Sequence, residues 1–228
     1  MHKAVLIGDC HSARVNEHHD KNEIDFEFNI WGVAGKKAYQ LDLNGLYAED
    51  RLCSGIEVGI KPGDHPDKDD KKIIGFKKMG EADIVLAWLG YVDIRTFLPR
   101  HDNSEKVVRH YVREFAEFYP NSRIQFIEPL PQFKQLFLKY DGISPEFTFE
   151  ERQLQNKKFN YYLNEYTEFL GLPKPITQDQ LFEVIGLDYL DLEHTRKHPS
   201  LPHPTDGLDN QYNKKLYDFF VSLAKPLT

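Results

Sequence analysis

The chain has 228 residues, 40% of them hydrophobic and 13% aromatic, which is enough bulky apolar material for a sizeable core and excludes general disorder. Its 36 acidic and 29 basic residues give a net charge of -7, which argues against general affinity for nucleic acids or anionic membranes. Two cysteines, Cys10 and Cys53, are too few for a disulfide framework, so reduced thiols are expected.

The N-terminal residues form an apolar run over residues 4–7, which is too short for a secretory signal or a membrane span. We therefore expect a cytoplasmic protein, with a virion as a second setting. The run predicts a strand buried on both faces, followed by Gly8-Asp9-Cys10-His11-Ser12.

Alternating apolar and polar residues over 24–30 predict a half-buried strand near a sheet edge. The glycines of residues 32–35 suit a tight turn into a helix over 36–47. Residues 48–80 break this rhythm and predict an inserted hairpin or lid with a polar tip.

A second wholly apolar strand is predicted over residues 83–90, followed by a helix whose apolar residues recur from Val107 to Tyr119. Residues 123–127 predict another strand. A long helix is expected over 150–170, while 182–192 is ambiguous between helix and strand. One apolar stripe is predicted on the long helix, with these members: Phe159, Tyr162, Leu163, Tyr166, Phe169 and Leu170.

A proline-rich loop at residues 198–207 precedes a last helix striped from Tyr212 to Leu223. Buried strands that alternate with amphipathic helices indicate one α/β domain over residues 1–228, with a mostly parallel sheet covered on both faces. In such sheets ligands bind beyond the carboxyl ends of the strands, where three loops rich in polar residues are expected to meet.

These loops resemble the sequence blocks of the SGNH/GDSL hydrolase superfamily, in the same order along the chain. In that family a nucleophilic serine follows Gly-Asp after the first strand, and here Cys10 stands at its position after Gly8 and Asp9. Residues 32–35 resemble the second block, with Gly35 as the implied oxyanion amide donor. The resemblance implies a three-layer α/β/α, flavodoxin-like fold.

The third block is matched by residues 90–95, from Gly90 to Arg95, with Val92 where the family has an oxyanion asparagine. This stretch is closest to the Gly-Glu-Ile-Asp-Cys-Arg variant of SGNH-like proteins, which implies substrate contacts for Gly90, Asp93 and Arg95. Asp93 and Arg95 can equally form a structural ion pair.

The fourth block, usually Asp-Gly-x-His, is matched by residues 205–209, with Asp206 in place and Asp209 where the histidine would stand. Asp209 cannot take over that role directly, because a carboxylate carries no proton to donate at neutral pH and disfavours a nearby thiolate. His203 could fill the vacant base position, His11 could act beside Cys10, or Ser12 could be the nucleophile.

Two functions follow from the resemblance. The first is an ester hydrolase that uses Cys10, with Asp206, Asp209 and His203 as catalytic partners and His11 at the substrate site, acting on a small-molecule or carbohydrate O-acyl ester. The second is a catalytically inactive SGNH-fold binding or assembly protein, in a surface-polysaccharide or virion context, with a protein partner or a homo-oligomer. No metal or other cofactor is expected for either function, because metal-ligand spacings and phosphate-binding glycine motifs do not occur in the sequence.

Overall fold

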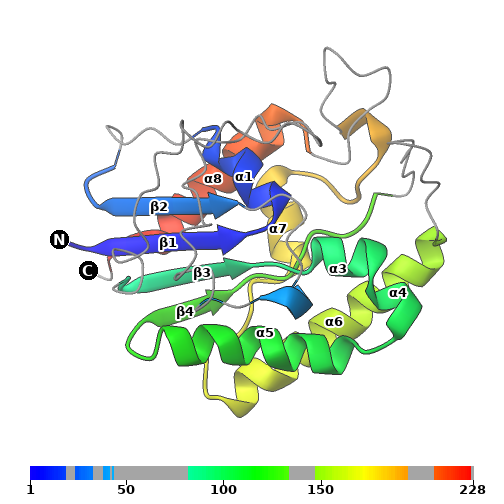
Figure 1. Ribbon diagram of the computed structural model, residues 1–228. Coiled ribbons are helices and arrows are strands. Elements are labelled where there is room, and N and C mark those ends of the chain that lie inside the picture. Colours follow the sequence, from blue (N-terminus) through cyan, green and yellow to red (C-terminus); the bar gives the residue numbers. More distant parts are fainter. Residues whose placement is uncertain are drawn as a thin grey trace, which may run out of the picture.

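The computed structural model describes residues 1–18, 24–32, 38–41, 43, 82–133, 147–194 and 208–226. Its centre is a parallel sheet of four strands in the order β2-β1-β3-β4 (Figure 1). The strands are β1 (Lys3–Gly8), β2 (Glu27–Gly32), β3 (Ile84–Trp88) and β4 (Arg123–Phe126). This arrangement confirms the predicted α/β class and the mostly parallel sheet.

The apolar pattern of each strand matches its place in the sheet. The two wholly apolar runs form the central strands β1 and β3, which pair from Ala4 with Ile84 onward. The alternating run forms β2 beside β1, where Phe28 and Ile30 are buried and the intervening Asn29 is half-buried. Beyond β4, Ile176 adds a single parallel bridge to the chain.

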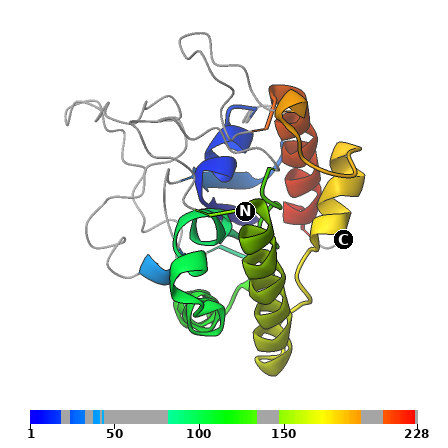
Figure 2. The same cartoon turned by 90° about the vertical axis from the view of Figure 1, so that its right-hand side faces the viewer.

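Helices cover both faces of the sheet, so the molecule has the three layers that were predicted (Figure 2). Residues of α1, α7 and α8 pack in the core of one face, and residues of α5 and α6 pack in the core of the other. The helical elements are α1 (Cys10–Asn16), η1 (Ala38–Gln40), α3 (Tyr91–Thr96), α4 (Leu98–His101), α5 (Ser104–Phe118), α6 (Phe149–Phe169), α7 (Gln178–Ile185), η4 (Leu192–His194) and α8 (Asn210–Ala224).

Local capping chemistry sets the limits of α6 and α7. Each begins at a threonine, Thr148 or Thr177, whose hydroxyl accepts from the backbone N–H three residues later. The side chain at that third residue, Glu151 or Gln180, accepts in return from the backbone of the threonine. At the other end of α7, Gly186 takes the left-handed conformation that ends many helices.

Several predictions change in detail. Of residues 182–192, the first four end α7, which begins at residue 178, and Leu192 begins η4. The helix expected over 36–47 is described only at η1, Leu41 and Leu43, and the hairpin expected at 48–80 lies outside the described residues. On α6, Phe159 and Leu163 are buried as predicted, whereas Phe169 is 82% exposed because it lies on another side of the helix from the buried Phe159, Leu163 and Thr167.

Candidate active site

The candidate site lies at the carboxyl ends of β1 and β3, the two central strands (Figure 1). The next strand in the chain, β2, pairs with one edge of β1, and the strand after it, β3, pairs with the other edge. Such a switch point leaves a crevice outside the strand ends, where α/β proteins bind ligands. The first block, around Cys10, and the third block, around Asp93, both begin there.

The turn from β1 into α1 requires a glycine at position 8. A Cβ atom on Gly8 would lie 1.8 Å from Ser12 Oγ and 2.5 Å from the carbonyl oxygen of Trp88. Ser12 is fully buried, and its hydroxyl has no hydrogen-bond partner within the described part of the chain. A hydroxyl packed against Gly8 in this way is poorly placed to attack a substrate, which disfavours the alternative with Ser12 as nucleophile.

Cys10 is the first residue of α1, and Asp9 caps that helix by accepting from the backbone N–H of His11 at 3.0 Å. Burial raises the pKa of Asp9 to about 7, while the N–H of His11 lowers it; Asp93 adds to the rise, and Arg95 opposes it. The carboxyl group beside Cys10 is therefore partly neutral at physiological pH.

The imidazole of His11 is buried beneath this turn. Its ring lies edge-on to Tyr91 at 4.3 Å between centroids and is tilted to Trp88 at 5.9 Å. Burial lowers the pKa of His11 to about 3, and the charges of Arg95 and Arg14 add to the shift. Neither ring nitrogen has a hydrogen-bond partner among the described residues, so the ring is held neutral by apolar and aromatic contacts.

The third block is shaped by Gly90, which has φ of 117°. A Cβ atom there would also lie 2.6 Å from the ring of Phe159. Downstream, Asp93 is fully buried and accepts from the backbone N–H groups of Ala38 at 2.7 Å and Tyr39 at 3.3 Å. Asp93 therefore attaches η1 to the third block, which is a structural use of its carboxylate.

Arg95, the last residue of this block, is half-buried, with its guanidinium carbon 5.9 Å from the ring centroid of Tyr91. The positive charge of Arg95 lowers the pKa of both Asp9 and His11, so Arg95 is close enough to influence the turn after β1. We define the strand-edge cluster as Asp9, His11, Ser12, Tyr91 and Asp93.

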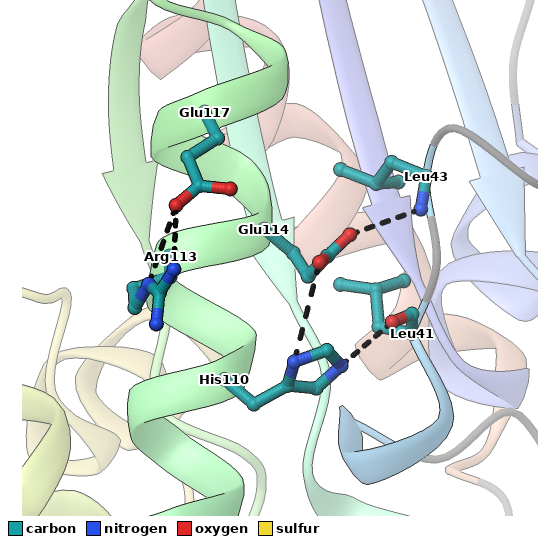
Figure 3. Close-up of polar contacts among 6 residues, drawn as sticks. All are labelled: Leu41, Leu43, His110, Arg113, Glu114 and Glu117. Atoms are coloured by element: carbon teal, nitrogen blue, oxygen red, sulfur yellow. Dashed lines mark hydrogen bonds and ion pairs between the residues drawn. The ribbon is translucent and has the colours of Figure 1, made fainter.

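A second attachment holds the segment after η1 against α5 (Figure 3). His110 donates from Nε2 to the carbonyl of Leu41 at 2.7 Å, and Leu43 donates its backbone N–H to Glu114 at 3.3 Å. Asp93 and α5 thus fix the chain just downstream of residues 33–37, which include Gly35 and lie outside the described residues.

The fourth block is described only from residue 208, so His203 and Asp206 are not placed. Asp209 is the N-cap of α8 and accepts from the backbone N–H of Gln211 at 3.1 Å. Its backbone N–H donates to the carbonyl of His194 at 2.9 Å. The Asp209 carboxylate therefore caps the start of α8.

Sequence reasoning missed His194, which lies in η4 outside any motif. The residue is 9% exposed, and its Nδ1 accepts from the backbone N–H of Asp191 at 3.1 Å. Its ring meets Tyr212 of α8 edge-on at 5.8 Å. Only the fold brings this imidazole beside the start of α8, so no sequence signal could have identified it.

A second polar cluster, also missed, lies after β4. Glu128 accepts from the side-chain amides of Asn160 at 3.1 Å and Asn164 at 3.3 Å, and from the backbone N–H of Gln178 at 2.8 Å. The side chain of Gln178 donates to Asn156 at 2.9 Å. Burial raises the pKa of Glu128. We call these five residues the amide cluster; they join β4 to α6 and α7.

Neither a metal centre nor a membrane-spanning helix is recognised in the described ranges. No three His, Cys, Asp or Glu residues gather there in a way that could hold a metal ion. None of the helices in the same ranges combines the length and apolar character that crossing a bilayer requires.

Comparison with known proteins gives structural matches only. No protein-family model and no curated protein matches the sequence. Among solved structures, a protein assigned to the G-D-S-L lipolytic family from Desulfitobacterium hafniense DCB-2 is 14% identical, with TM-score 0.51 and coverage of 98% of this chain and 99% of its own.

Two further structures are named as acetylesterases. A carbohydrate acetylesterase family member from Sinorhizobium meliloti is 9% identical, with TM-score 0.53 over 98% of this chain and 97% of its own. The acetyl xylan esterase AlAXEase is 12% identical, with TM-score 0.51 over 97% and 98%. The protein therefore has the α/β/α fold of GDSL lipolytic proteins and acetylesterases. These likenesses extend over nearly the whole chain.

Proposed function

We propose that this protein is an SGNH-type ester hydrolase that acts without a cofactor and uses Cys10 as its nucleophile. One observation carries the proposal: Cys10 begins α1 at the carboxyl end of a central strand, at the switch point of a fold shared with esterases. The third block, from Gly90 to Arg95, starts at the end of the neighbouring strand.

The chemistry proceeds through a thioester. The Cys10 thiolate attacks the ester carbonyl carbon, and the carbonyl oxygen becomes an oxyanion that accepts from the backbone N–H groups of Cys10 and Gly35. Collapse of this intermediate breaks the carbon–oxygen bond, and the leaving alcohol takes a proton. Water then attacks the thioester, which releases the carboxylic acid and regenerates the thiol.

The base in this scheme is His203, with Asp206 orienting its imidazole. Asp209 is unsuited to the role because its carboxylate already accepts the backbone N–H of Gln211 at the start of α8. His11 is unsuited because a ring with a pKa of about 3 is a poor proton acceptor at neutral pH. Asp9, with its pKa near 7, places less negative charge beside the thiolate than an ordinary carboxylate would.

The proposed substrate is an acetyl ester on a carbohydrate or other small molecule. Two proteins of the same fold are named as a carbohydrate acetylesterase and an acetyl xylan esterase, and both are covered almost completely by this chain. Arg95 and the turn after β3 would line the substrate crevice in this scheme.

Hydrolysis of 4-nitrophenyl acetate and of acetylated xylo-oligosaccharides tests the proposal. Cys10→Ala should lower kcat/KM at least about 100-fold, since loss of the nucleophile removes the covalent route. Cys53→Ala is the matched control and should leave kcat/KM unchanged. Mass spectrometry of acid-quenched protein should find an acetyl group on Cys10. Equal rates in wild type and Cys10→Ala would refute the proposal.

A second candidate is a non-catalytic binding module on the same scaffold. The observation that favours it is that His11 and His194 are both committed to other contacts, while Asp209 caps a helix. This candidate predicts no hydrolysis above the Cys10→Ala background. It also predicts similar iodoacetamide alkylation of Cys10 and Cys53, whereas the enzyme predicts faster alkylation of Cys10, with a pH midpoint below that of a free thiol.

A further inference from the structure

Exposed apolar side chains are concentrated on one helix. In the described residues six large hydrophobic side chains are exposed, and four belong to α6 or directly follow it. They are Leu154 at 53%, Tyr161 at 59%, Phe169 at 82% and Leu170 at 41% exposed. Figure 2 shows α6 on the outside of the molecule.

Two of these residues, Leu154 and Tyr161, alternate with charged residues along one ridge of α6. Leu154, Lys157, Tyr161, Glu165 and Glu168 are all exposed and recur at spacings of three and four residues, as on one face of an α-helix. We call these five residues the α6 ridge. At 1.5 Å per residue, it is about 21 Å long.

The charged side chains of Lys157, Glu165 and Glu168 make no hydrogen bond or ion pair within the described part of the chain. Because they are also exposed, they are available to a partner outside the chain.

We propose that the α6 ridge is the contact surface for a second copy of this chain, with the two α6 helices antiparallel and Tyr161 on the two-fold axis. In that arrangement residues equally distant from Tyr161, before and after it, lie at the same level on opposing helices. Lys157 and Glu165 each lie four residues, or about 6 Å, from Tyr161. Two reciprocal Lys157–Glu165 ion pairs therefore form across the axis.

The same axis brings the first residue of the ridge in one copy close to the last turn of α6 in the other copy. Leu154, seven residues before Tyr161, meets the level of Glu168 and Phe169 of the second copy, so its methyl groups lie over the aromatic ring and the aliphatic stem of the glutamate. A two-fold axis makes every contact occur twice, which is why a single self-complementary ridge suffices.

The opposite orientation of the helices is electrostatically unfavourable. A parallel pair in register would place Lys157 against Lys157, Glu165 against Glu165 and Glu168 against Glu168. The antiparallel pair instead converts two of these repulsions into attractions. One helix pair makes a small interface, so the dimer should dissociate on dilution. The charge of -7 on each chain opposes association mainly at low salt.

Sedimentation velocity of the full chain in 150 mM salt, over a protein concentration range of about 1 to 300 μM, tests the proposal. Wild type should shift from monomer to dimer. Lys157→Glu and Glu165→Lys should each weaken dimerisation at least about 10-fold, because each creates like-charged contacts. The double variant Lys157→Glu/Glu165→Lys should restore the wild-type dissociation constant, because it reverses both partners of each ion pair.

Only an antiparallel arrangement predicts this restoration, since a parallel pair would stay repulsive in the double variant. Glu117→Lys on α5 is a matched control on another exposed helix and should dimerise like wild type. Circular dichroism checks that each variant is folded. A wild type that stays monomeric throughout, a dimer insensitive to Lys157→Glu, or a double variant that remains monomeric would each overturn the proposal.

Discussion

The strand-edge cluster and the amide cluster both place a buried carboxyl group just after a parallel strand. The polar groups around the two carboxyl groups differ in how many hydrogen bonds they make. In the amide cluster the Glu128 carboxylate accepts from three donors, although Asn156 Nδ2 and Asn160 Oδ1 are buried without a partner in the described chain. In the strand-edge cluster the His11 ring and the Ser12 hydroxyl are buried without partners in the described chain.

Buried polar groups are normally hydrogen-bonded, so a paired cluster is what structural stability selects. The Glu128 carboxylate fits that description, because its hydrogen bonds connect three separate elements, and this indicates a structural role for the end of β4. The unpaired His11 ring and Ser12 hydroxyl reduce stability at the end of β1, a cost that the function proposed for that strand end would explain.

Replacement of Gly90 by alanine should have the largest effect on stability, because this glycine shapes the turn that follows β3. The added Cβ would meet the Phe159 ring at 2.6 Å, and φ of 117° disfavours any side chain. We expect a loss of about 3 kcal/mol in urea unfolding. Gly171→Ala, also at positive φ but with no atom within 4 Å, should lose only about 1 kcal/mol.

Removal of the carboxylate from the amide cluster should be nearly as damaging. Glu128→Ala removes the acceptor of three half-buried donors, of which only the Asn164 amide keeps another acceptor, so we expect a loss of about 3 kcal/mol by chemical denaturation. Glu128→Gln keeps one acceptor oxygen and should lose about 1 kcal/mol. If Glu128→Ala were as stable as wild type, the cluster would have no structural role.

Substitution of Asp9 tests the strand-edge cluster through pH. The folded-state pKa of about 7 exceeds the unfolded value of 3.8, so wild-type stability declines as pH rises between these values. Asp9→Asn keeps an oxygen to cap α1 but cannot ionise. We expect this variant to be about 2 kcal/mol more stable than wild type at pH 8, and the gain to vanish near pH 4.

His11→Phe should have the smallest effect. The folded-state pKa of about 3 lies below the reference value of 6.5, so wild type loses stability as pH falls through this window. Phenylalanine keeps the edge-on contact with Tyr91 and does not titrate. Thermal unfolding should show a gain of about 1 kcal/mol at pH 5.5 and little change at pH 8. A gain that is equal at both pH values would contradict the buried, neutral imidazole.

Sequence patterns predicted the sheet well because the spacing of apolar residues along a strand reflects which of its faces are buried. The wholly apolar runs became the central strands, and the alternating run became the edge strand β2. The short stretch over 182–192 stayed ambiguous because periodicity over so few residues fits both helix and strand. The exposure of Phe169 was missed because the stripe shows which residues are apolar, whereas exposure depends on which side of α6 faces the core.

Residues of the candidate site could be predicted only where they come soon after a strand in the sequence. The positions of Cys10 and Gly90 followed from motif order and from the rule that parallel strands end at one edge. His194 and the amide cluster were not predictable, because their members come from segments far apart in sequence. The capping role of Asp209 was hidden as well, because Asp206 and Asp209 both precede the last helix and the sequence does not say where that helix begins.

The pairing of β1 with β3 has a consequence for how the chain is made. Ala4 finds its partner Ile84 only 80 positions later, so at about 5 to 20 residues per second a ribosome needs roughly 4 to 16 s to supply it. During that interval the apolar face of the first strand has no central neighbour. Newly synthesised chains should therefore depend on chaperones that shield the N-terminus until the second half of the sheet has emerged.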